Sequence, residues 1–89
     1  MKTFNDLEFK PHPNGETDYG IISRIKFDNG YGASVVKGPH TYGGDQGLYE
    51  LAVLDSEGEI TYDTSITNDV EGYLKEEDVT KLLEQIQNL

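Results

Sequence analysis

The stretch YGIISRIKFDNGYGASVV, residues 19–36, decides the fold because it contains two apolar alternations separated by a turn signal. In its first half the apolar side chains occupy odd positions, at Tyr19, Ile21, Ile25 and Phe27, while Arg24 and Lys26 occupy even ones. Ile22 is the apolar exception. The second half again has its larger groups at odd positions, Tyr31, Ala33 and Val35. A period of two predicts two half-buried strands.

The length of the turn follows from the need to keep both apolar sets on one face. A two-residue loop at Asn29 and Gly30 would pair Asp28 with Tyr31 and place the two sets on opposite faces of the sheet. A three-residue loop with Gly30 in the left-handed conformation pairs Phe27 with Tyr31 and keeps the sets together. We therefore predict the three-residue loop.

The remaining strands have weaker signals. Residues 48–54 are apolar on both faces except at Glu50, which is typical of a strand covered on two sides. DSEG at 55–58 predicts a turn, and residues 60–66 alternate again, predicting a fourth strand that pairs back as a hairpin. Residues 3–10 alternate only weakly, and Pro11 and Pro13 end that segment. Both an N-terminal strand and an extended, partly ordered segment over 1–18 remain open.

The C-terminal segment predicts an amphipathic helix. Apolar side chains recur at spacings of three, four and seven, at Val79, Leu82, Leu83 and Ile86. Acidic residues occupy the expected first turn, where the helix dipole favours negative charge: Glu76, Glu77 and Asp78. The sequence therefore predicts a single α+β domain over residues 1–89, an antiparallel meander sheet of about four strands with one C-terminal helix packed on one face.

Charge and composition exclude several classes of protein. The net charge is −10, and residues 50–89 hold eleven acids against Lys75 and Lys81, so this part alone carries −9. Such a balance disfavours binding to nucleic acid or to an anionic membrane surface, and leaves a cationic partner as the electrostatic option. The chain has no cysteine, no long apolar run and no apolar secretory segment. We therefore expect a cytoplasmic protein without a membrane segment.

Searching for chemistry gives no complete signature, so we expect neither an enzyme nor a resident cofactor or metal. The serines lack a nucleophile elbow, and only His12 and His40 could act as bases for a hydrolytic triad. His40 and Asp45 could supply two metal ligands, but no further histidine or cysteine stands at ligand spacing. The turn DSEGE lacks the alternating oxygen ligands of a calcium loop.

Within the segment KGPHTYGGDQGLYEL, residues 37–51, the glycine-rich loop of residues 37–47 is the candidate recognition loop. It is not a phosphate-binding loop, because its lysine precedes the glycines and no Gly-Lys-Ser/Thr follows. It could be a long hairpin connection without further function. Its length and its mixture of aromatic, polar and glycine residues are also common in binding loops. The candidate binding residues are His40, Thr41, Tyr42, Gly43, Gly44, Asp45 and Gln46.

At this segment the chain also resembles a known group of proteins. The strings NGYGASVVKGPHTYGGDQGLYELAVLD and YDTSITNDVEGYLKEEDV are similar to small uncharacterised proteins encoded by tailed bacteriophages and prophages, over about residues 19–86. The resemblance implies a context rather than an activity. Small phage proteins in the host cytoplasm often bind and disable host factors, including defence systems.

Two hypotheses follow. In the first, an accessory protein binds a basic surface on a host protein, one involved in defence or in handling nucleic acid, through acids of its C-terminal half: Glu57, Glu59, Asp63, Asp69, Glu71, Glu76, Glu77 and Asp78. In the second, the loop closes over a nucleotide-like molecule, with Lys37, Arg24 and Lys26 supplying positive charge. The acidity could also serve solubility alone. The sequence leaves homo-oligomerisation open.

Overall fold

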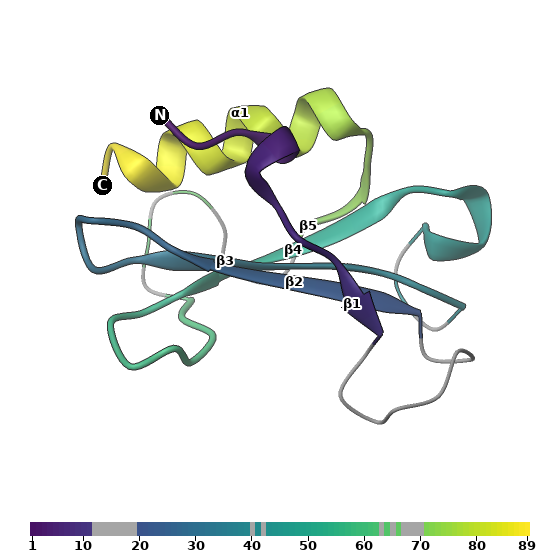
Figure 1. The fold of residues 1–89 in the computed structure, drawn as a ribbon, viewed down its shortest axis with the longest axis horizontal. Helices are drawn as coiled ribbons and strands as arrows, with labels where there is room; N and C mark the ends of the chain where they lie inside the picture. The colour runs from purple at the N-terminus through teal and green to yellow at the C-terminus, as the bar shows by residue number, and fades with distance from the viewer. Residues whose placement is uncertain (12–19, 40, 42, 63, 65, 67–70) are drawn as a thin grey trace.

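The computed structural model describes residues 1–11, 20–39, 41, 43–62, 64, 66 and 71–89. Within these residues, five antiparallel strands form one sheet in the meander order β1-β2-β3-β4-β5. The helix α1 crosses one face of this sheet (Figure 1). The predicted α+β fold is thereby confirmed. The elements are η1 Phe4–Asp6, β1 Lys10–Pro11, β2 Ile21–Lys26, β3 Gly32–Lys37, η3 Gly44–Gln46, β4 Tyr49–Leu54, β5 Glu71–Leu74 and α1 Glu76–Gln87.

The β2–β3 turn is the three-residue loop that the alternation of apolar side chains predicts. The Phe27 N–H donates to the Tyr31 carbonyl at 2.8 Å, and the Gly30 N–H donates to the Phe27 carbonyl at 3.1 Å. Gly30 has a φ of 93°, in the left-handed region that favours glycine. The register continues with Lys26 opposite Gly32 and Ile25 opposite Ala33, so the odd-numbered apolar side chains share one face.

The predicted strand over residues 60–66 is wrong. In its described part only Ile60 forms a bridge, to Leu54, and Asp63 and Ser65 lie outside the described residues. β5 pairs with β4 instead, with Tyr49 opposite Leu74. Leu74 of β5 and Ile66 of the predicted strand both pack against the core, whereas Ile60 and Tyr62 remain 47% and 51% exposed.

The N-terminal segment forms a strand only at Lys10–Pro11, which pairs with β2 at the edge of the sheet. Before it, η1 lies beside α1, and the Phe4 N–H donates to the Thr80 hydroxyl at 3.1 Å. Gln87 ties the chain start to the helix end, since its side-chain amide exchanges two 2.8 Å hydrogen bonds with the backbone of Lys2. Phe4, Leu7 and Phe9 pack against the core from this side.

The core lies between α1 and the odd-numbered face of the sheet. Val79, Leu83 and Ile86 of α1 are fully buried there, as are Ala33, Val35, Leu51 and Val53 of the sheet. The helical face was therefore predicted correctly at three of its four positions. Leu82 is only partly buried, because it lies at the margin of this contact.

Candidate functional site

Backbone and side-chain hydrogen bonds within the loop of residues 37–47 give it a folded shape. The Thr41 hydroxyl accepts the Gly38 N–H at 3.0 Å and donates to the Gly38 carbonyl at 2.9 Å. The Gly44 N–H donates to the Thr41 carbonyl at 3.1 Å, and η3 follows. Thr41, one of the predicted binding residues, therefore stabilises the shape of the loop.

Both central glycines are required by close contacts within the protein. A Cβ on Gly44 would overlap the Gly38 carbonyl oxygen. A Cβ on Gly43 would lie 2.9 Å from the Cα atom of Tyr73, and Gly43 itself has a φ of 88°. The glycines thus let the loop pack on itself and on β5. Their contacts support the reading of the segment as a strand connection.

The polar candidates of the loop are divided. Asp45 and Gln46, on η3, are exposed, whereas His40 and Tyr42 lie outside the described residues.

The cations proposed for a nucleotide-like ligand do not gather here. Lys37 lies over the Tyr49 ring, 4.9 Å from its centroid, on the face shared with the core. Arg24 and Lys26 occupy the alternate positions of β2 and therefore face the other side of the sheet.

Tyr73 is a neighbour of this loop that sequence reasoning missed. It sits at a bulge in β5, where the pairing shifts between Tyr49–Leu74 and Leu51–Glu71. Its φ is 56°, and its side chain is 57% exposed. A non-glycine residue in the left-handed region is uncommon and costs about 1–2 kcal/mol. The only sequence signal was the pair Gly72-Tyr73 before the helix, which breaks a regular strand pattern.

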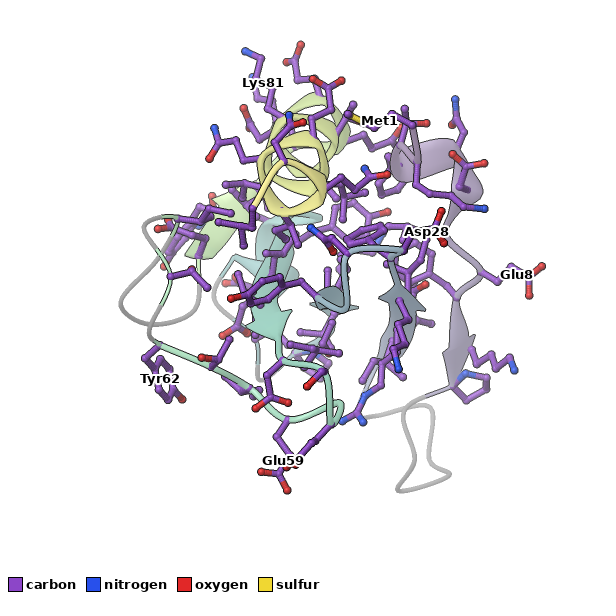
Figure 2. The ribbon with its side chains drawn as sticks, turned by 90° about the vertical axis from the view of Figure 1, so that its left-hand side faces the viewer. Met1, Glu8, Asp28, Glu59, Tyr62 and Lys81 are labelled. Carbon is purple, nitrogen blue, oxygen red and sulfur yellow. The ribbon has the colours of Figure 1, made fainter. Side chains whose placement is uncertain are left out.

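The acids of the C-terminal half lie on two different sides of the sheet. Glu57 and Glu59 are exposed on the turn after β4, which stands on the side away from α1, as Figure 2 shows for Glu59. Glu76 and Glu77 are exposed at the start of α1, on the opposite side. Asp78 caps that helix by accepting the Lys75 N–H at 3.0 Å. Asp63 and Asp69 lie outside the described residues. The predicted acidic surface is therefore divided.

Asp55 fixes the turn that carries Glu57 and Glu59. Its carboxylate oxygen Oδ1 accepts the backbone N–H groups of both residues, at 2.9 Å and 3.1 Å. The Asp55 N–H also donates to the Glu59 carbonyl at 2.8 Å, and Gly58 has a φ of 80°. The backbone of this acidic turn, which we define as residues 55–59, is thus held in place while its glutamate side chains point into solvent.

Beside the acidic turn lies the open face, which we define as the sheet surface opposite α1, formed by the even-numbered residues of β2, β3 and β4. A hollow of about 230 Å³ lies on it. The lining is mixed, with apolar, basic and acidic side chains: Ile22, Arg24, Ser34, Val36, Glu50, Ala52 and Ile60. The sequence signal for this surface was Ile22, the exception to the alternation, together with Val36. Sequence reasoning did not identify this hollow.

Several other kinds of site find no support in the described part of the chain. No three histidine, cysteine, aspartate or glutamate side chains within it lie close enough together to hold a metal ion. None of its helices is both long enough and apolar enough to span a bilayer. No protein-family model, curated protein or solved structure matches the chain.

Proposed function

We propose that the protein is a non-catalytic accessory protein, encoded by a phage, that binds a basic surface on a host protein in the host cytoplasm and thereby modulates or inhibits it. The contact site is the acidic turn with the two exposed side chains that follow it, Ile60 and Tyr62. A host protein that normally holds nucleic acid would present the basic surface that fits these acids.

One observation carries this proposal. Glu57 and Glu59 are held at the rim of the open face, directly before an isoleucine and a tyrosine that are 47% and 51% exposed. Apolar and aromatic side chains supply most of the binding energy at protein interfaces, while charges at the rim direct the encounter. Solubility alone explains the glutamates, but it gives no reason for exposing Ile60 and Tyr62 beside them.

The test compares three immobilised forms of the protein in lysate of the host. The wild type and Glu76→Lys/Glu77→Lys, which changes the same charge on α1, should retain the same basic protein. Glu57→Lys/Glu59→Lys should lose it, and the retained protein should elute as salt rises. Equal retention by all three forms, or elution that ignores salt, would contradict the acidic turn as the contact site.

A second candidate is a binder of a small nucleotide-like ligand at the loop of residues 37–47. The specific observation in its favour is Tyr73, whose exposed ring lies next to Gly43. Asp45, in η3, follows Gly43 by two residues. The dispersal of Lys37, Arg24 and Lys26 speaks against it. Native mass spectrometry of the purified protein discriminates the two candidates, because a retained small molecule that Tyr73→Ala abolishes would favour the ligand.

A further inference from the structure

The strand registers arrange the open face in three rows. The first row runs Lys10–Ile22–Val36–Glu50, since these residues are paired across β1, β2, β3 and β4. The second runs Arg24–Ser34–Ala52. The third runs Lys26–Gly32–Leu54 and continues to Ile60 through its bridge to Leu54. Each row therefore begins with a cation at the β1–β2 side.

The opposite side of the same face is acidic. The third row ends beside the acidic turn, because Leu54 directly precedes Asp55 and Ile60 directly follows Glu59. Arg24, Lys26, Glu57 and Glu59 are all exposed, and within the described residues their side chains form no ion pair with one another. The face is thus positive along β2 and negative at the turn beyond β4.

Between these two charged sides the centre of the face carries small and apolar side chains. Ile22 and Val36 are partly exposed there, and Ile60 stands 47% exposed at the wall formed by the turn. Ser34 and Ala52 form a floor of small side chains, 8% and 5% exposed. Small residues in the centre leave room for a side chain from a partner, and the hollow of about 230 Å³ is that room.

We infer that this face binds a second copy of the same chain, in a symmetric dimer with the two sheets face to face. A two-fold axis parallel to the strands places β2 of each copy over β4 of the other. Lys26 and Arg24 of one copy then meet the acidic turn of its partner, and symmetry makes the contact twice. The alternative axis, perpendicular to the strands, would put cations over cations and is disfavoured by repulsion.

The spacing of packed sheets suits this arrangement. Two sheets pack about 10 Å apart with their strands within about 30° of each other. The acidic turn projects on the open-face side of the sheet, as the position of Glu59 in Figure 2 shows, so it can reach across to β2 of the partner. The contact remains small, because six-residue strands extend only about 20 Å. We expect reversible association with a dissociation constant of about 10 µM to about 1 mM rather than a permanent dimer.

The inference shares the acidic turn with the proposed function, but it needs no host protein. A dimer covers Glu57, Glu59 and Ile60, so self-association and partner binding would compete for one surface. At high concentration the protein would then be a dimer. A host protein could bind the acidic turn only by displacing the second copy. The two ideas fail separately, because a protein that stays monomeric can still bind a host protein through its turn.

The test uses complementary charge reversals measured by sedimentation equilibrium at low salt. Arg24→Glu/Lys26→Glu and Glu57→Lys/Glu59→Lys should each lower the association constant at least about tenfold, because each puts like charges opposite one another. An equimolar mixture of the two variants should associate again, since the reversed charges now match across the interface. Lys75→Glu/Lys81→Glu and Glu76→Lys/Glu77→Lys, which make the same changes in charge away from this face, should dimerise like the wild type.

A second measurement keeps the test decisive if a reversed variant fails to fold. The chain contains no cysteine, so Lys26→Cys and Glu59→Cys each introduce a single thiol. A short bis-maleimide should join the two variants to each other in a mixture more than it joins Lys81→Cys to either one. A wild type that remains monomeric up to about 1 mM, a dimer that both reversals leave intact, or a mixture that does not associate would each overturn the inference.

Discussion

Asn29 joins the β2–β3 turn to the end of α1. Its side-chain amide Nδ2 donates a 2.8 Å hydrogen bond to the Ile86 carbonyl, while its Oδ1 accepts the Tyr31 N–H at 3.0 Å. The last carbonyls of a helix lack partners within the helix, so this bond satisfies one of them. A residue in the most local turn of the chain thereby fixes where the C-terminal helix docks, 57 positions later.

Replacing Asn29 with Ala should therefore cost more than a turn substitution usually does. We expect a loss of about 1–2 kcal/mol in the free energy of unfolding, because two hydrogen bonds are removed, one part-buried and the other local to the turn. Urea denaturation measures it, with Asn5→Ala, an exposed asparagine of η1, as the control that should stay within about 0.5 kcal/mol. From the sequence alone, Gly30→Val would be expected to cost more stability than Asn29→Ala, because Gly30 needs a positive φ. The bond from Asn29 to Ile86 makes the expected difference between the two losses smaller.

Two adjacent leucines of α1 should respond differently to the same substitution. Leu83 is fully buried, so Leu83→Ala should cost about 2–5 kcal/mol through lost transfer energy and a cavity. Leu82 is partly exposed at the edge of the core, and Leu82→Ala should cost clearly less. Chemical denaturation of the two variants compares them directly. A larger loss at Leu82 would mean that α1 is rotated about its axis relative to the structure described.

Two glycines of the loop at 37–47 provide a matched pair. Gly44→Ala should destabilise by several kcal/mol or distort the loop, because its Cβ would overlap the Gly38 carbonyl. Gly47→Ala has open space around it and a φ of 76°, so it should cost only the left-handed strain of about 1 kcal/mol. Thermal unfolding of both variants tests the pair. Equal losses would show that the loop does not depend on the close contact between Gly44 and Gly38.

The β2–β3 hairpin and the helical face could be predicted because each rests on local periodicity. One choice of turn length keeps Phe27 and Tyr31 in register with both apolar sets, so the sequence alone determines it. β5 could not be found in this way, because its few residues include Gly72 and a bulged Tyr73, and a longer alternation at 60–66 competes with it. Side chains from both segments, Leu74 and Ile66, pack against the core, so the choice of strand depends on the packing of the whole fold.

The candidate surfaces were predicted only in part, for a similar reason. The acids of residues 50–89 can be counted in the sequence, but a count carries no information about which side of the sheet each acid occupies. The turn at Asp55 sends Glu57 and Glu59 away from α1, and that direction depends on where Leu54 ends its strand. The basic side of the open face went unnoticed because Lys10, Arg24 and Lys26 come from two strands whose pairing the sequence did not establish.

Tyr73 gives the last prediction, since its backbone is strained and its side chain is largely exposed. Asparagine tolerates the left-handed region better than tyrosine, so Tyr73→Asn should relieve part of the strain. Because the ring is 57% exposed, we expect little loss of packing and a change between no effect and about 1 kcal/mol of added stability. The measurement is a thermal melt of wild type and Tyr73→Asn, with the exposed Tyr62→Asn as the control without a positive φ.

The same variant separates a structural tyrosine from a functional one. Strain persists where the surrounding structure or a binding role maintains it. If Tyr73 serves recognition beside the loop of residues 37–47, Tyr73→Asn should keep or raise the melting temperature and lose binding of partner or ligand, whereas Tyr62→Asn would affect only binding at the acidic turn. A clear drop in the melting temperature of Tyr73→Asn would instead show that the contact of its ring with the Gly43 region stabilises the fold, which would account for the tyrosine without any ligand.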